Sequence, residues 1–204
     1  MFEDEYNTIS GFSQGIYRER GSRFIALAYP VSTENEVKEI LQSIKKEYNS
    51  ARHWCYAYRL GWDKSAYRMN DDGEPSGTAG KPIYGQILSH DLTNVLIVVV
   101  RYFGGIKLGV SGLIGAYRAA TIEAIQNTEI ISKPVKDINE VIFGYEVMND
   151  IMPLLKKEGV YILETEYFDE NVKIVFEVNK SLSIFVCDQL SGFDKTKVKY
   201  IETI

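Results

Sequence analysis

The chain is poor in cysteine and histidine, the side chains on which disulfide frameworks and zinc sites depend. Its 204 residues include two cysteines, Cys55 and Cys187, and two histidines, His53 and His90. The cysteines lie far apart and form no C-x-x-C pair, which argues against a zinc motif and against a disulfide scaffold. We therefore expect no metal ion, and a reducing cytoplasmic compartment.

The sequence also lacks a long apolar segment. Its longest continuous apolar run is VLIVVV at residues 95–100, far below the roughly 18 residues that a membrane-spanning helix needs. The first ten residues, MFEDEYNTIS, are acidic and do not have the basic and apolar regions of a signal peptide. We expect no membrane span and no membrane partner.

An excess of positive charge is absent as well. The chain carries 23 basic and 28 acidic residues, a net charge of −5. Residues 1–130 hold 14 basic and 15 acidic groups, and residues 131–204 hold 9 and 13. Nonspecific nucleic-acid binding depends on counterion release from phosphates and usually shows as a basic domain or stripe. A nucleic-acid function must therefore rest on a local cationic patch.

The composition is that of an ordinary globular protein, with 45% apolar and 25% charged residues. The order of apolar and polar residues also predicts a first set of strands and helices. Thr33 and Glu36 have the spacing of a helix capping box. The predicted elements are a hairpin of strands at 11–19 and 22–31, a helix at 33–48, a strand at 51–60, a helix at 82–90, a strand at 94–103 covered on both faces, and a helix at 113–129. Together they predict an α/β domain over residues 1–131.

A second pattern follows a polar, proline-containing segment. This segment, SKPVKD at residues 132–137, is the predicted linker. Residues 138–204 then alternate as strand, helix, strand, strand, helix and strand, which is the βαββαβ order of the ferredoxin-like fold. The predicted fold class is α+β, with the N-terminal α/β domain followed by a small ferredoxin-like domain at 138–204.

Two glycine-rich loops precede predicted helices, and the first, DDGEPSGTAGKP, covers residues 71–82. Each loop has glycines and a lysine at the helix start: Gly77, Gly80 and Lys81 in the first, and Gly109, Gly112 and Lys107 in the second. Backbone amides and one ammonium group in this arrangement can bind phosphate. Pro82 stands where a P-loop has Ser or Thr, and the glycine spacing at 109–115 does not match a dinucleotide fingerprint. We therefore expect no nucleotide cofactor.

The strand at 94–103 ends in Arg101, Tyr102 and Phe103. An arginine beside aromatic rings suits phosphate binding with base stacking. The alternative is that the rings close the edge of the core, because large aromatic side chains are often partly buried.

Acidic and nucleophilic side chains leave further alternatives open. Asp71, Asp72 and Glu74 can cap the turn, which is the commoner role of aspartate, or can bind a cation or act as acid and base. His53 and Cys55 share one face of a strand and can form a dyad, although a strand histidine more often has a structural partner. We assign no catalytic residue. The predicted ligand-binding residues are Arg52, His53, Asp72, Glu74, Ser76, Thr78, Lys81, Arg101, Tyr102, Lys107 and Arg118.

Four segments, NDDGEPSGTAGKPI, NVLIVVVRYFGGIKLGVSGLIGAY, RGSRFIA and HWCYAY, resemble the signature segments of the YigZ/IMPACT family. The resemblance implies a bacterial two-domain member. Its N-terminal domain would be like the second domain of ribosomal protein S-five, and its C-terminal domain would be similar to the last domain of the translocating elongation factor. Both relatives contact RNA. Ser111 stands where a glycine is usual, and Gly115 where an arginine commonly precedes Ala116, so one basic contact is not supplied.

The resemblance also implies a class of function. Eukaryotic members regulate translation by competing for a partner of a stress-responsive initiation-factor kinase, whereas no settled activity comes with the bacterial family name. The leading hypothesis is a cytosolic translation-associated regulator that binds RNA, the ribosome or a translation-factor partner through the glycine-rich, locally basic face.

Two other classes of function compete with this one. The first is an enzyme for a small phosphorylated or nucleotide substrate, with Asp72, Glu74 or His53 transferring protons. The second is a purely protein-binding adaptor. A basic cleft with exposed aromatic side chains favours RNA binding, a deep closed pocket favours the enzyme, and a flat apolar patch favours the adaptor. We further expect residues 71–82 and 101–115 to converge on one face that carries both Lys81 and Lys107.

Overall fold

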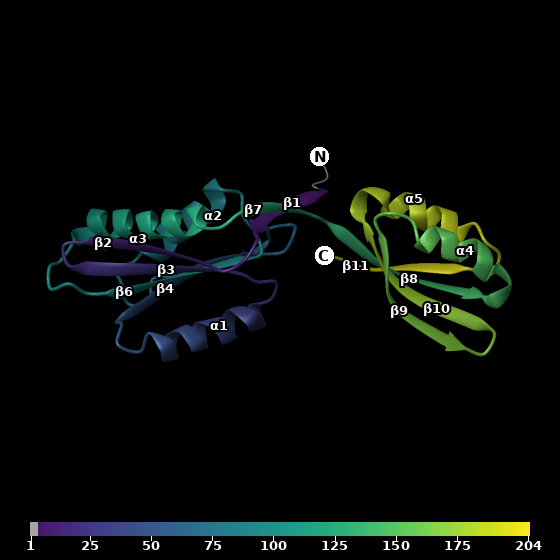
Figure 1. The fold of residues 1–204 in the computed structure, drawn as a ribbon, viewed down its shortest axis with the longest axis horizontal. Helices are drawn as coiled ribbons and strands as arrows, with labels where there is room; N and C mark the ends of the chain where they lie inside the picture. The colour runs from purple at the N-terminus through teal and green to yellow at the C-terminus, as the bar shows by residue number, and fades with distance from the viewer. Residues whose placement is uncertain (1–3) are drawn as a thin grey trace. The chain divides into compact units, whose positions relative to one another are not determined.

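The computed structural model describes residues 4–204, which divide into two compact units. One unit is Asn7–Lys133, and the other combines the chain up to Tyr6 with Pro134–Ile204 (Figure 1). Strands β1 (Glu5–Ile9) and β7 (Ile130–Pro134) form a two-stranded sheet of their own, and the division falls within both strands. The segment predicted as the linker, 132–137, contains the end of β7 and the start of the next strand.

The N-terminal unit is built on a five-stranded antiparallel sheet. Its strands lie in the order β2 (Ser13–Glu19), β3 (Ser22–Pro30), β6 (Val95–Tyr102), β4 (His53–Leu60) and β5 (Ala66–Asn70). All neighbouring pairs are antiparallel. The unalternating apolar run forms the central strand β6, whose first six residues are fully buried, as predicted for a strand covered on both faces.

Helices cover both faces of this sheet (Figure 1). Helix α1 (Glu34–Glu47) packs on one face, and its N-cap Thr33 accepts a hydrogen bond from the Glu36 amide, which confirms the predicted capping. Helices α2 (Gly80–Ser89) and α3 (Gly109–Gln126) pack on the other face. The apolar periodicity predicted that helix α3 begins at residue 113, whereas it begins at Gly109. The first four residues were missed because Gly109, Val110, Ser111 and Gly112 form no apolar face.

The second unit confirms the predicted βαββαβ order. It contains β8 (Lys136–Gly144), a 3-10 turn η1 (Tyr145–Val147), α4 (Met148–Leu155), β9 (Val160–Phe168), β10 (Asn171–Asn179), α5 (Lys180–Ser191) and β11 (Lys197–Thr203). The sheet order β11-β8-β10-β9, with both helices on one face, is that of a ferredoxin-like domain.

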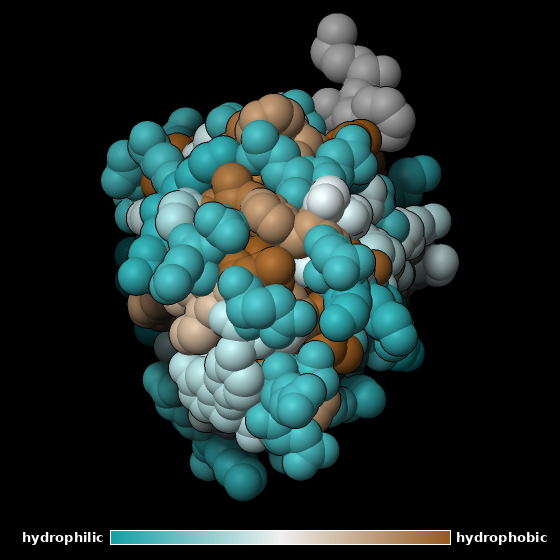
Figure 2. Space-filling model, turned by 90° about the vertical axis from the view of Figure 1, so that its right-hand side faces the viewer, coloured by the Kyte–Doolittle hydropathy of each residue, from teal (hydrophilic) through white to brown (hydrophobic). Residues whose placement is uncertain are grey.

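The surface of the second unit is mixed in character. Figure 2 looks onto this unit from the right-hand side of Figure 1 and shows apolar side chains lying between polar ones. Because residues 131–204 hold 9 basic and 13 acidic groups, the unit as a whole does not attract a polyanion. None of the helices in the described part of the chain combines the length and the hydropathy that a membrane crossing requires.

Candidate functional site

The glycine-rich loop at 71–82 holds a carboxylate of its own. Asp71 Oδ2 accepts a hydrogen bond from the Gly77 amide at 2.8 Å, and Asp71 Oδ1 accepts from the amides of Ala79 at 3.0 Å and Gly80 at 2.8 Å. A carboxylate at a helix start satisfies amides that have no partner within the helix and interacts favourably with the helix dipole. The predicted phosphate site at Gly77 and Gly80 is therefore wrong, because these amides are already occupied.

The neighbouring Asp72 also serves the loop. Its Oδ2 accepts from the Trp54 amide at 2.8 Å, and its Oδ1 lies 3.6 Å from Lys45 Nζ. The Asp72 carbonyl oxygen lies 2.9 Å from Nδ1 of His53. Because a carbonyl oxygen only accepts, Nδ1 donates this hydrogen bond. Asp72 thus orients the imidazole ring through its backbone and does not reach a ligand through its carboxylate.

Two further predicted residues of the loop have different environments. Thr78 is buried, and its hydroxyl donates to the Pro75 carbonyl oxygen at 2.6 Å, so the side chain faces its own loop and not a ligand. Ser76 is exposed at the surface of the loop.

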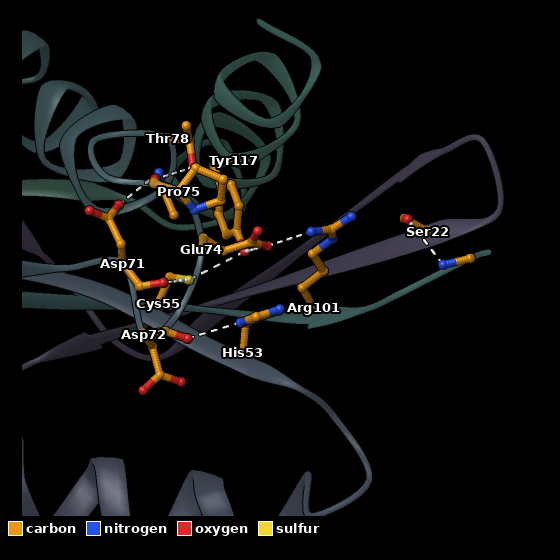
Figure 3. A network of polar contacts seen from close by, with 12 residues as sticks. Ser22, His53, Cys55, Asp71, Asp72, Glu74, Pro75, Thr78, Arg101 and Tyr117 are labelled. Carbon is orange, nitrogen blue, oxygen red and sulfur yellow. Dashed lines mark hydrogen bonds and ion pairs between the residues drawn. The ribbon is translucent and has the colours of Figure 1, made fainter. Parts of the chain in front are cut away.

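A buried chain of polar contacts runs from the loop to strand β6 and helix α3. Glu74 Oε1 pairs with Arg101 Nη1 and accepts from the Tyr117 hydroxyl at 2.8 Å (Figure 3). The side chains of Glu74 and Arg101 are only 4% and 7% exposed. A buried ion pair is costly to desolvate, and removing either partner would leave an uncompensated charge. These contacts fix Arg101 at the end of β6.

Cys55 belongs to this buried chain and not to a catalytic pair. The single hydrogen of its thiol has two acceptors within reach, the Asp71 carbonyl oxygen at 2.9 Å and the Tyr117 hydroxyl oxygen at 3.3 Å. Burial raises the pKa of the Cys55 thiol, and also that of the Tyr117 hydroxyl, well above their ordinary values. Cys55 therefore stays protonated and unreactive, and the hypothesis of a dyad with His53 is wrong.

Beyond the Glu74–Arg101 pair lies a cavity of about 450 Å³, called here the β6-end cavity. Arg52, His53, Glu74, Pro75, Arg101, Phe103, Lys107, Leu108, Gly109, Val110 and Leu113 line it. The start of α3 faces the cavity without a side-chain cap. Arg101 Nε is buried and has no hydrogen-bond partner among the described residues. The cavity thus combines the uncapped start of a helix with the Arg101 guanidinium group, and each of these favours an anion.

The structure brings together only some of the predicted residues. Arg52, His53, Glu74, Arg101 and Lys107 line the β6-end cavity. The two glycine-rich segments converge there through Glu74 and Pro75 of the first and through 101–113 of the second.

Lys81 and Arg118 line another groove, of about 500 Å³, with Met69, Tyr84, Leu88 and Ile114, which we call the α2–α3 groove. Lys81 and Lys107 therefore line different hollows, and Lys81 directly follows the amides of Ala79 and Gly80 that Asp71 occupies.

Tyr102 lies on the α1 side of the sheet, where it contributes to a third hollow. This hollow, of about 420 Å³, is lined by Arg18, Glu19, Arg20, Gly21, Ser22, Arg23 and Tyr102, and we call it the hairpin patch. The Arg23 guanidinium carbon lies 4.6 Å from the centroid of the Tyr102 ring. Sequence reasoning missed the three arginines, although the signal was present as RERGSR between two predicted strands.

Comparisons with known proteins place these features in a family. The family model for the Impact N-terminal domain matches residues 20–125, just over half of the chain. The IMPACT family member YvyE of Bacillus subtilis is 39% identical over 152 residues, which cover 74% of this chain and 70% of that protein. YigZ of Escherichia coli is 38% identical over 148 residues, which cover 72% of each. A crystal structure of a hypothetical protein is 26% identical and has a TM-score of 0.78, with 98% of this chain and 99% of that chain covered.

Proposed function

This chain belongs to the IMPACT family, as its motifs predicted, and from that premise we propose that it is a translation-associated regulator that binds RNA phosphate in the β6-end cavity. The resemblance of its motifs to those of eukaryotic members, which regulate translation, supports the cellular role. The observation that carries the binding site is the convergence of Arg101 and the uncapped start of α3 on one cavity.

The charges around the cavity favour a phosphate group. Glu74 balances one cation, Arg101, whereas Arg52 and Lys107 are exposed and form no ion pair within residues 4–204. Amides at a helix start add partial positive charge, and charge-assisted hydrogen bonds to phosphate are among the stronger ones in proteins. The cavity therefore keeps an excess of positive charge in a chain whose net charge is −5.

An aromatic ring at the same cavity favours a nucleotide over inorganic phosphate. Phe103 is 44% exposed, and the Arg101 guanidinium carbon lies 5.6 Å from its ring centroid. An exposed ring beside a guanidinium can stack on a base while the cation holds the neighbouring phosphate. The combination of a basic cleft and an exposed aromatic side chain supports RNA binding over the alternatives.

The test measures the affinity for purified ribosomal RNA as a function of salt. Arg52→Gln and Lys107→Gln should each weaken binding and lower the slope of log K against log salt by about one, because each removes a phosphate contact. Lys81→Gln and Arg118→Gln remove the same charge from the α2–α3 groove and should change neither quantity. Equal effects of all four substitutions would show that only the net charge matters, and the proposed site would be abandoned.

The α2–α3 groove supports a second candidate, the protein-binding adaptor. Its apolar lining includes the exposed Met69 and Leu88, and its cations Lys81 and Arg118 have no ion pair in the described part of the chain. This combination fits an acidic, partly apolar protein segment. If Lys81→Glu with Arg118→Glu abolishes co-sedimentation with ribosomes while Lys107→Gln preserves it, the adaptor is the better description.

Fewer side chains are available for proton transfer than the enzyme hypothesis assumed. The Asp72 carboxylate binds the Trp54 amide and pairs with Lys45, and Glu74 is tied to Arg101 and Tyr117. Of the three predicted proton-transfer groups, only His53 presents a free nitrogen in the cavity. The geometry therefore supports binding better than catalysis.

A further inference from the structure

We infer that the β6-end cavity is one part of a longer site for a single-stranded nucleic acid, and that this site continues across the end of the sheet to the hairpin patch. The inference rests on the proposed function, because it assumes that the cavity holds a phosphate. It adds the class of ligand and a second set of contacts, provided by Arg18, Arg20, Arg23 and Tyr102.

The first observation is an uncompensated charge in the β2–β3 hairpin. Arg18 and Arg23 lie directly opposite each other in the antiparallel register, and both are exposed. Like charges at directly opposed positions destabilise a sheet. Neither arginine forms an ion pair within residues 4–204, and the nearby Arg20 pairs at 3.6 Å only with its own neighbour Glu19. A phosphate group between the two opposed guanidinium groups would remove this repulsion.

The second observation is that the two hollows lie at the end of one strand, on the two faces of the sheet. Arg101 and Phe103 line the β6-end cavity, and Tyr102 lines the hairpin patch. The next residue, Gly104, donates its amide to Ser22 Oγ at 3.1 Å (Figure 3). A Cβ at Gly104 would lie 1.9 Å from the carbonyl carbon of Gly21, so the two backbones are in direct contact. A strand that reaches both hollows therefore has to pass around the end of the sheet, where Gly21 and Gly104 carry no side chain.

The third observation is a repeated pairing of arginine with an aromatic ring. Arg23 lies over Tyr102 with 4.6 Å between the guanidinium carbon and the ring centroid, and Arg101 lies over Phe103 at 5.6 Å. Single-strand binding sites usually combine aromatic rings, on which bases stack, with cationic side chains that bind the backbone phosphates. A duplex keeps its bases stacked on one another and cannot use such rings.

The charges of the two hollows taken together favour a polyanion. Their lining residues include six cationic side chains, Arg18, Arg20, Arg23, Arg52, Arg101 and Lys107, against the two carboxylates Glu19 and Glu74. A free nucleotide carries one phosphate cluster and would engage only one hollow. A strand with successive phosphates engages both, which makes a single-stranded nucleic acid the ligand that fits best.

The test uses fluorescence anisotropy on the full-length protein with labelled oligouridylate of about twelve nucleotides, within the usual site size of such proteins. The double variant Arg18→Gln with Arg23→Gln should bind it at least tenfold more weakly, and the salt slope should fall by about 0.7, because the two arginines hold one phosphate and each single-strand phosphate contact contributes about 0.7. Tyr102→Leu should weaken binding about tenfold and leave the salt slope unchanged, because stacking releases no counterion. A matched control, Arg68→Gln with Lys81→Gln, loses the same charge elsewhere and should bind like the unmodified protein.

A labelled dinucleotide separates this inference from the proposed function. Lys107→Gln should weaken binding of both ligands, whereas the hairpin double variant should weaken only the longer one. If the hairpin variant binds oligouridylate normally while Lys107→Gln does not, the longer site is refuted and the cavity proposal stands. If no variant affects binding, or no RNA binds, the proposed function itself fails. Equal affinity for a duplex of the same length would also overturn the inference, and binding of oligothymidylate would extend it to single-stranded DNA.

Discussion

At the scale of single residues, Asp71 decides what the glycine-rich loop does. Helix α2 has no side-chain cap at its N-cap residue Ala79, and the carboxylate that serves its first amides comes from eight and nine positions earlier in the chain. Local capping motifs span three residues, so this contact has no simple sequence signature. Gly77 has a φ of +75°, which favours glycine, and a Cβ at Gly80 would lie 2.7 Å from the Asn70 amide nitrogen, so each position of the turn requires glycine for its own reason.

Replacing Asp71 should therefore destabilise the N-terminal unit. In Asp71→Asn the side chain keeps one acceptor oxygen and gains an NH₂ group, which cannot accept from the amides that the second carboxylate oxygen now serves. We expect the free energy of unfolding to fall by about 2 kcal/mol, the usual cost of unsatisfied buried donors together with a lost helix-dipole interaction. Urea denaturation followed by circular dichroism measures the change.

Ser76→Ala is the matched control for Asp71→Asn, because it alters an exposed side chain of the same loop. Surface substitutions of this kind usually change stability by less than about 0.5 kcal/mol. If Asp71→Asn is no more destabilising than the control, the carboxylate does not organise the loop, and the amides at Gly77 and Gly80 become candidates for an external anion again.

At the scale of elements, periodicity predicted most helices and strands, because each buries one regular apolar face. Strand β5 was missed because its first four residues, Ala66, Tyr67, Arg68 and Met69, are all exposed and show no alternation of apolar and polar side chains. The antiparallel arrangement was not predictable from the pattern either. In parallel sheets, ligands bind at the edge where the carboxyl ends of the strands lie. In this antiparallel sheet, the corresponding edge carries the amino ends of β3 and β4 together with the carboxyl ends of β2 and β6.

This arrangement explains which site residues could be predicted. Arg101, Lys107, His53 and Glu74 stood out because each lies beside a motif of unusual composition. The register that places Arg101 opposite His53, and Tyr102 opposite Arg23, depends on strand pairing between distant segments. The three hairpin arginines were therefore missed, and Lys81 was assigned to a site from which the fold separates it.

The contact between Gly104 and Gly21 provides a test at this scale. In Gly104→Ala the new methyl group would overlap the backbone of Gly21, 1.9 Å away, so the hairpin has to move away from the end of β6. We expect a loss of about 1–3 kcal/mol in the free energy of unfolding, as for other overpacked positions, together with weaker binding of long oligonucleotides. Chemical denaturation and the anisotropy measurement above check both effects.

Gly115→Ala is the control for Gly104→Ala. A Cβ at Gly115 meets nothing within 4 Å, and the residue lies inside α3, so the substitution should be neutral or stabilising by up to about 1 kcal/mol. Equal stability of the two alanine variants would mean that the hairpin adapts freely, and that the backbone contact between Gly104 and Gly21 has no structural role.

At the scale of the whole molecule, the cationic surface and the acidic excess lie in different units, each of which has its own fold. The net charge of −5 conceals a cationic end of the N-terminal sheet, and an acidic ferredoxin-like unit follows. A total charge therefore says little about a chain of this kind, because a polyanion responds to the local field of the surface that it contacts. The strand pairing that creates this local field lies entirely within the N-terminal unit.

The last prediction concerns where the ferredoxin-like unit begins. The sequence pattern placed its start at residue 138, yet Val135 is fully buried and its carbonyl oxygen accepts from the Lys180 amide at 2.9 Å. Lys136 exchanges two backbone hydrogen bonds with Ile204, at 2.9 and 2.8 Å, and Asp137 Oδ1 accepts from the Thr203 hydroxyl at 2.7 Å. A fragment of residues 134–204 keeps these contacts, and a fragment of residues 138–204 loses all of them.

We expect residues 134–204 to fold alone, with a cooperative urea transition followed by circular dichroism. Domains of this size bury only about 60% of their chain surface and are marginally stable, so the loss of one buried side chain and several hydrogen bonds is a large fraction of the total. Residues 138–204 should be less stable by at least about 2 kcal/mol, or unfolded. Equal stability of the two fragments would show that residues 134–137 are a linker after all, and an unfolded 134–204 fragment would show that the unit depends on the rest of the chain.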